Sequence, residues 1–275
     1  MTTVEAARDD MEGVDRSVPP IASCALPLAY VTVVAVAQAL PALANPLSGA
    51  ITNAVLLLVL LEHRRFFFVQ RQWPGAAIMS VALGSLALVP LLTLLSLAFE
   101  LRRTSVWSYA LIGPPAVLAV VLAARTLAPD RSFRNWVGGR APRQAAAAAC
   151  GVPLGLAGFA LLDPEPLARS LSGAALIGAA AVVFVVAGLV EEAIFRGLVQ
   201  PGLVNVLGAL VGTAAASLLF AAAYLRTGSV EVVGFFAILG TLAGAWVQRT
   251  GDVAGVAAAH GLLAAGLIVV WPMLL

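Results

Sequence analysis

The chain has 275 residues, of which 61% are hydrophobic and only 11% are charged, and its mean hydropathy is +0.99. This composition excludes a water-soluble globular domain, which averages about 45–50% apolar and about 25% charged residues, because the excess apolar surface must be solvated by lipid. The net charge of +2 is too small, and the basic residues are too dispersed, to indicate a nucleic-acid partner.

Nine apolar runs follow one another along the chain. At roughly 20 residues for each crossing of the hydrocarbon, they predict an all-α membrane protein, a polytopic bundle of about 8–9 transmembrane helices in the cell membrane. The second run is short for a full crossing and could be tilted or partly re-entrant. The runs cover residues 24–44, 47–61, 76–99, 106–124, 144–162, 171–203, 206–225, 230–247 and 253–273.

Composition divides the chain into three parts. Residues 1–20 are polar and carry both charge signs, and we interpret them as a disordered cytoplasmic lead-in. Residues 21–143 are Leu/Val-rich and form an N-terminal group of about four transmembrane helices. Residues 144–275 are rich in glycines spaced by four, which is typical of tightly packed membrane helices. These glycine pairs are Gly151/Gly155, Gly208/Gly212, Gly240/Gly244 and Gly251/Gly255.

The arginines predict the orientation of the bundle. The segments 63–71 and 125–143 are rich in arginine, whereas the linkers at 100–103 and 163–169 are short and mixed in charge. Arginine-rich loops remain in the cytoplasm. The N-terminus is therefore predicted to be cytoplasmic, and nine crossings would place the C-terminus on the opposite side.

Two adjacent carboxylates, Glu191 and Glu192, follow an apolar run within the sixth predicted helix. An ionisable group in a membrane segment costs about 2.5–3.5 kcal/mol and is by default a functional candidate. Glu192 and Arg196 are four residues apart, in the favourable order for a helical ion pair. Glu191 points about 100° away and has no partner from its own helix, which suits a general base or acid. The alternatives are a wetted helix end and a packing clamp between helices.

Two further polar side chains occur in later helices. His260 lies about five residues inside the last predicted helix among small side chains, where there is room for water or a substrate beside the ring. Its alternative interpretation is a hydrogen-bonded packing residue. Tyr224 ends an apolar helix, where it could equally be an interfacial aromatic residue.

Taken in order, these motifs resemble those of the CAAX-protease and bacteriocin-processing family of intramembrane endopeptidases. The family pattern is Glu-Glu-x-x-x-Arg, then Phe-x-x-x-His, then His-x-x-x-Asn on successive membrane helices. This chain is similar to it from about Gln144 to Leu275, with Glu191-Glu192-Ala-Ile-Phe-Arg196, Phe220-Ala-Ala-Ala-Tyr224 and the stretch from Gln248 to His260. It departs from the pattern where Tyr224 stands for the second-motif histidine and Ala264 for the asparagine.

The resemblance implies a bacterial membrane endopeptidase that hydrolyses a membrane-associated protein or peptide. Glu191 would activate water, Glu192 and Arg196 would support it, and His260 would be the remaining polar partner. Tyr224 could donate to an oxyanion in place of the histidine.

Whether the site uses water alone or a divalent metal such as zinc is left open. Tyr224 is a poor zinc ligand and Ala264 supplies none, so a three-ligand zinc site is hard to assemble. The two departures also motivate an alternative function, a catalytically impaired pseudoprotease that serves as a membrane scaffold or binding partner.

Overall fold

The computed structural model of the chain describes residues 21–67, 74–98, 106–127, 141–166 and 171–275. The predicted lead-in, residues 1–20, lies outside the described residues. The first helices are α2 (Ile21–Leu43), α3 (Pro46–Arg65), α4 (Pro74–Ala98), α5 (Val106–Leu127) and α6 (Ala141–Leu162). They are followed by α7 (Ala174–Val183), the π-helical turns η3 (Phe184–Val190) and η4 (Ala193–Val199), α8 (Gln200–Leu207), α9 (Ala209–Ala223), the 3-10 turn η5 (Tyr224–Thr227), α10 (Val230–Thr250), α11 (Val253–Ala265), the π-helical turn η6 (Gly266–Val270) and α12 (Trp271–Leu274).

The described residues form an all-α polytopic bundle, which confirms the predicted fold class. Seven of its helices are long and apolar enough to cross a membrane, and α4 and α5 contain shorter apolar stretches at Gly75–Ala87 and Tyr109–Leu118. The helix that contains the second apolar run, residues 47–61, is longer than the run itself. It is α3, which has 20 residues and continues to Arg65. Its N-terminus is capped by Asn45, whose side chain accepts a hydrogen bond from the Ser48 backbone N–H over 2.8 Å.

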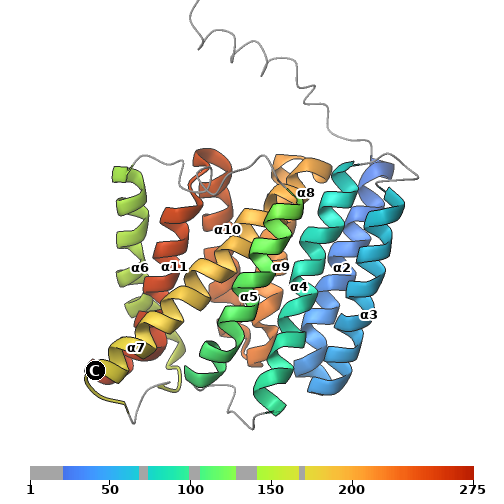
Figure 1. Cartoon of the computed structure of the whole chain (residues 1–275). Helices are drawn as coiled ribbons and strands as arrows, with labels where there is room; N and C mark the ends of the chain where they lie inside the picture. The colour runs from blue at the N-terminus through green and yellow to red at the C-terminus, as the bar shows by residue number, and fades with distance from the viewer. Residues whose placement is uncertain (1–20, 68–73, 99–105, 128–140, 167–170) are drawn as a thin grey trace, which may run out of the picture.

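Successive helices run in alternating directions through the bundle (Figure 1). We call the N-side the face where α2, α6 and α11 begin and where α3, α8 and α10 end. The C-side is the opposite face, where α2, α6 and α9 end and where the chain itself ends at Leu275. The polar residues of the three motifs lie on helices that run in opposite directions between these faces.

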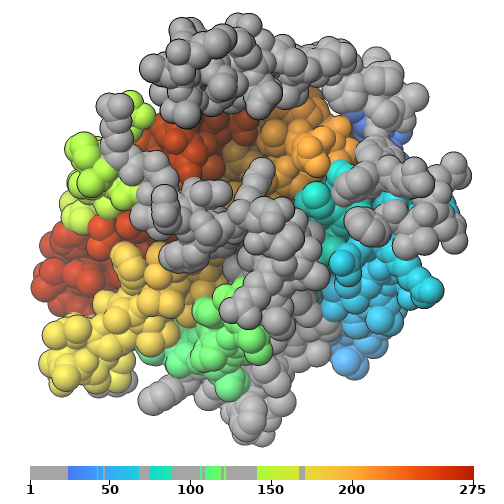
Figure 2. Space-filling view, turned by 45° about the horizontal axis from the view of Figure 1, so that its top comes forward, coloured from blue at the N-terminus to red at the C-terminus, as the bar shows by residue number. Residues whose placement is uncertain are grey.

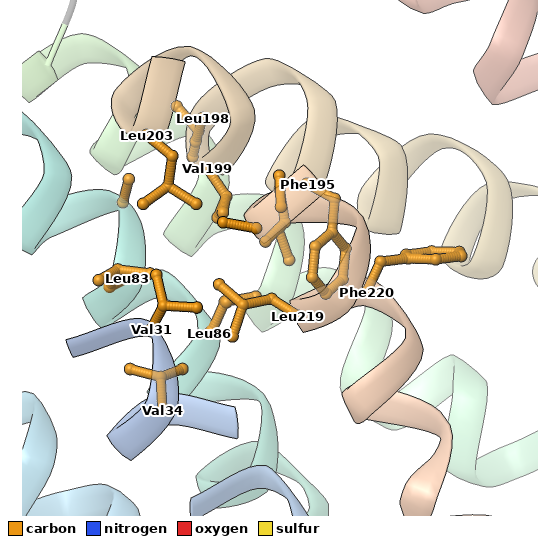
Figure 3. Close-up of a cluster of buried hydrophobic side chains, with 14 of the residues drawn as sticks. Val31, Val34, Leu83, Leu86, Phe195, Leu198, Val199, Leu203, Leu219 and Phe220 are labelled. Atoms are coloured by element: carbon orange, nitrogen blue, oxygen red, sulfur yellow. The ribbon is translucent and has the colours of Figure 1, made fainter. Parts of the chain in front are cut away.

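A shared apolar core connects the N-terminal helices to the segment that carries the motifs. Val31 and Val34 of α2 and Leu83 of α4 point toward Val199 and Leu219, which belong to η4 and α9 (Figure 3). On the face shown in Figure 2, the described part of α5 lies beside α7. The N-terminal group is therefore in direct contact with the helices that build the site.

In the C-terminal part of the chain, some of the glycines spaced by four lie where two helices are in close contact, and others lie in the turns between helices. Gly151 and Gly155 of α6 lie directly against the backbone of α11 at Ala259 and Leu263, as expected for tightly packed membrane helices. Gly208 and Gly251, by contrast, have φ values of +79° and +69° and lie in turns between helices. The expectation of helix packing was wrong for these two glycines, because such a backbone conformation ends a helix.

Candidate active site

The two motif carboxylates lie in the middle of an unusually long helix. Residues Ala174–Leu207 form one continuous apolar helical span of 34 residues. Glu191 and Glu192 stand between its two π-helical turns, η3 and η4. Such turns change the direction of the side chains that follow and frequently occur at functional sites. The helix continues well beyond Arg196, so both carboxylates lie far from either end of the span.

Glu192 and Arg196 form the predicted ion pair, and they are almost completely buried, with exposures of 1% and 2%. Arg196 Nε lies 3.2 Å from Glu192 Oε2, and Nη1 donates to Oε1 over 3.3 Å. Arg196 Nη2 also donates to the Gly240 carbonyl of α10 over 3.0 Å, and its guanidinium lies 4.2 Å from the ring centroid of Phe220. The burial excludes a wetted helix end, and the bond to α10 gives the arginine a role in helix packing.

His260 of α11 connects this ion pair to the third motif. Its Nδ1 lies 2.9 Å from Glu192 Oε1, and its side chain is only 7% exposed. The contact depends on a close crossing of η3 and α11 at Gly188 and Gly261. A Cβ atom on Gly188 would lie 2.5 Å from the Gly261 Cα, so neither helix has room for a larger residue there.

Tyr224 bridges the histidine and the first glutamate. Its hydroxyl donates to Glu191 Oε2 over 2.9 Å and lies 3.4 Å from His260 Nε2. The phenol ring is stacked on Phe236 of α10, with centroids 3.7 Å apart and an interplanar angle of 7°. With an exposure of 8%, Tyr224 is a buried member of the site, which disfavours the interpretation as an interfacial aromatic residue.

The structure therefore brings the five predicted residues into one hydrogen-bonded chain, in the order Arg196, Glu192, His260, Tyr224, Glu191. Glu191 is half-buried. Among the described residues, no arginine or histidine nitrogen lies within ion-pair distance of its carboxylate. The two carboxylates therefore differ. Glu192 is ion-paired with Arg196 and contacts His260, whereas Glu191 has a hydrogen bond from the Tyr224 phenol.

Sequence reasoning missed two residues that interact electrostatically with Glu191. Arg226 follows Tyr224 by two positions in η5, so its proximity to the second motif was visible in the sequence. Tyr109 comes from α5 and packs against the apolar cluster that contains Val183 and Ala264. It lies far from any motif, and nothing in the sequence marked it.

Ala264 occupies the position of the family's asparagine, and both its side chain and its surroundings are apolar. Ala264 is buried in a small cluster with Ala179, Val183 and Ala187. It makes no polar contribution, and an amide at this position would enter apolar surroundings.

The residues present do not fit a catalytic zinc ion. Within the described ranges, no three His, Cys, Asp or Glu side chains are grouped so that they could hold a metal. His260 Nδ1 is engaged by Glu192, which leaves Nε2 and Glu191 as donors with a phenol between them. A catalytic zinc site needs three protein ligands, and the third is missing from this arrangement.

Comparison with known proteins finds one family to which part of the chain is similar. Residues 173–266 match the family model described as type II CAAX prenyl endopeptidase Rce1-like. The matched segment contains all five residues of the hydrogen-bonded chain and excludes Tyr109. The chain matches no curated protein and no solved structure. The resemblance predicted from the three motifs is confirmed, and this segment is similar to the Rce1-like membrane endopeptidases.

Proposed function

We propose that the protein is an intramembrane endopeptidase that hydrolyses a membrane-associated protein or peptide with water activated by Glu191. The observation that carries this proposal is the Glu191 carboxylate. It is half-buried, has no ion-pair partner among the described residues and is joined through the Tyr224 hydroxyl to His260. A carboxylate in this setting can accept a proton from a water molecule.

The reaction would begin when Glu191 removes a proton from water and the resulting hydroxide adds to the carbonyl carbon of the scissile bond. The carbonyl oxygen then becomes an oxyanion, and the proton on Glu191 passes to the leaving amine as the C–N bond breaks. Tyr224 is the donor nearest to this carboxylate. Because its hydroxyl has a single proton, it must turn from Glu191 to the oxyanion during the reaction.

Glu192 and Arg196 would act by orienting His260. An ionised carboxylate only accepts hydrogen bonds, so the His260 nitrogen that contacts Glu192 must carry a hydrogen. The other nitrogen, Nε2, then faces the Tyr224 hydroxyl at 3.4 Å. A buried carboxylate that holds an imidazole in one orientation is a recurring device in hydrolases. In this arrangement Nε2 can exchange a proton with the tyrosine or with the leaving group.

Glu191→Gln tests the proposal directly. The full-length protein is reconstituted in liposomes with a pool of synthetic hydrophobic peptides, and cleavage is read by mass spectrometry. The amide cannot accept the proton, so we expect turnover to fall by a factor of about 10²–10⁴. Glu231→Gln is the matched control, because Glu231 is exposed at the start of α10 and bonded only to Ser229 among the described residues. Unchanged turnover in Glu191→Gln refutes the assigned base.

A second function, a pseudoprotease that acts as a membrane scaffold, is favoured by the apolar surroundings of Ala264 and by Tyr224 at the family's histidine position. The double variant Tyr224→His, Ala264→Asn separates the two. Cleavage that appears only in the double variant would identify a decayed enzyme. A stable copurifying partner, with no proteolysis even in that variant, would favour the scaffold.

A further inference from the structure

We infer that Gln200 is a positioning residue for the proposed hydrolysis, because its amide fixes α10 against the long helix that carries the two carboxylates. The inference rests on the proposed peptidase function and extends it to a residue outside the hydrogen-bonded chain. Gln200 is the first residue of α8, directly after η4, and it is only 2% exposed. Its Nε2 donates to the Gly244 carbonyl of α10 over 3.0 Å and lies 3.5 Å from Thr213 Oγ1 of α9.

Arg196 and Gln200 together hold α10 at two points. Arg196 Nη2 donates to the Gly240 carbonyl over 3.0 Å, and the bond from Gln200 to Gly244 lies four residues further along both helices. Carbonyls four residues apart in an α-helix are separated by about 6 Å along its axis. The two bonds therefore fix both the height and the tilt of α10. With the bond to Gly240 alone, α10 could pivot about that carbonyl.

The hydroxyl of Ser217 in α9 is a weaker restraint on α10. Its Oγ lies 3.0 Å from the Gly240 carbonyl oxygen and 2.9 Å from the Thr213 carbonyl oxygen of its own helix. A hydroxyl has a single proton, so Ser217 cannot donate fully to both carbonyls. The amide nitrogen of Gln200 has two protons and can donate to Gly244 while it contacts Thr213. Gln200 is therefore the second anchor of α10.

The placement of α10 matters because this helix contacts both ends of the hydrogen-bonded chain. Its Gly240 carbonyl accepts from Arg196, which is paired with Glu192. One turn earlier, Phe236 is stacked on the ring of Tyr224 with centroids 3.7 Å apart. A shift of α10 would displace the arginine and the phenol together. Misplacement of a reacting group by about 1 Å can lower the rate by about 10², so a residue that only holds α10 can affect the chemical step.

The surroundings of Gln200 separate this role from a contribution to stability. Its Oε1 is buried and makes no hydrogen bond with any described residue. A buried acceptor without a partner costs free energy, and this cost opposes the gain from the bond to Gly244. Methionine has a similar length and removes both. Gln200→Met should therefore leave the thermal unfolding midpoint nearly unchanged, whereas a positioning role predicts slower turnover.

The test measures kcat and KM for the full-length protein in nanodiscs, with the peptide that the unmodified protein cleaves fastest in the hydrophobic pool. We expect Gln200→Met to lower kcat by about 10–10²-fold and to leave KM unchanged, since the loss is in orientation rather than in substrate binding. Gln38→Met is the matched control. Gln38 is also buried, and its Nε2 also donates to a backbone carbonyl of another helix over 3.0 Å, at Leu86 of α4. The control should keep the kcat of the unmodified protein.

A second pair of variants moves α10 while Gln200 stays intact. A Cβ atom on Gly244 would lie 3.0 Å from both Ser217 Oγ and Thr213 Cγ2, so Gly244→Ala should push α10 away from α9 and lower kcat as well. Gly234→Ala is its control on the same helix, because a Cβ there meets no described atom within 4 Å. This control should leave kcat unchanged.

Spin labels report the position of α10 without any substrate. They are attached to Ile177→Cys in the long helix and Ile238→Cys in α10, which are both exposed, in a background where the two native cysteines are alanine. Double electron–electron resonance then gives the distance distribution between the labels. We expect Gln200→Met to shift or broaden this distribution and Gln38→Met to leave it unchanged. An unchanged distribution in Gln200→Met overturns the inference, and so does a kcat that is unchanged or falls equally in both variants.

The two proposals fail in different ways. If the unmodified protein cleaves no peptide, the peptidase is refuted, and the distance distributions alone decide whether Gln200 positions α10. Cleavage that depends on Glu191 but is insensitive to Gln200→Met leaves the peptidase standing and refutes the positioning role.

Discussion

Tyr224 and Glu191 are joined by a hydrogen bond in which the phenolic hydroxyl donates to Oε2 over 2.9 Å. The two residues lie on different helices, and the same hydroxyl is 3.4 Å from His260 Nε2. A donor with one proton thus stands between the proposed base and the imidazole. This relationship separates two roles for the tyrosine, as a donor to the oxyanion or as a restraint on Glu191.

Tyr224→Phe distinguishes these roles. If the hydroxyl stabilises the oxyanion, its loss should lower kcat by about 10²–10³, the usual effect of removing one such donor. The stacking on Phe236 does not need the hydroxyl, so we expect the variant to fold. Tyr30→Phe is the control, because Tyr30 is hydrogen-bonded to His63 in the N-terminal helices. An increase in kcat for Tyr224→Phe would show that the hydroxyl restrains the base instead.

Glu192→Gln should destabilise the protein strongly. The substitution leaves Arg196 buried without a counter-ion, and breaking a buried pair from one side costs about 3–5 kcal/mol. Thermal unfolding in nanodiscs, followed by circular dichroism, measures the loss. Glu231→Gln, which changes an exposed carboxylate, should leave the midpoint nearly unchanged. If the midpoints of both variants agree with that of the unmodified protein, the pair does not stabilise the bundle.

Gly151→Ala should separate α6 from α11. A Cβ atom at this position would lie 2.9 Å from both the Cα and the carbonyl carbon of Ala259, which are backbone atoms that cannot move aside. We expect a loss of about 1–3 kcal/mol, the typical cost of overpacking. Gly178→Ala is the matched control, because a Cβ there meets no atom within 4 Å. It should be neutral or slightly stabilising through helix propensity. Equal effects from the two variants would contradict the close contact.

The helical bundle could be predicted because long apolar runs in the sequence indicate membrane helices. The Glu192–Arg196 pair followed from four-residue spacing, whereas a site shared by Glu191 and His260 was implied by the resemblance of the three motifs to the family pattern. The π-helical turns around the glutamates could not be predicted, since hydrophobic periodicity does not distinguish a short π-helical turn from the α-helix on either side of it. The electrostatic interaction of Tyr109 with Glu191 could not be predicted either, because it depends on how α5 packs against η3.

The remaining prediction concerns the side of the membrane on which the site opens. Tyr109, Tyr224 and Arg226 all lie near the C-side ends of their helices. The arginine-rich segments 63–71 and 125–143 include the last residues of α3 and α5, and both helices end on the N-side. The positive-inside rule assigns the N-side to the cytoplasm, so the proposed substrate would approach from the other face.

Single cysteines test this orientation in a background where Cys24 and Cys150 are alanine. Glu231→Cys is exposed on the C-side and Gln248→Cys is exposed near the N-side end of the same helix, α10. In intact cells, a membrane-impermeant maleimide should label the first cysteine and spare the second until the membrane is permeabilised. The reverse pattern would mean that the arginines do not set the topology, because both reporters belong to one helix and must exchange sides together. The site would then face the cytoplasm, and its substrates would be found there.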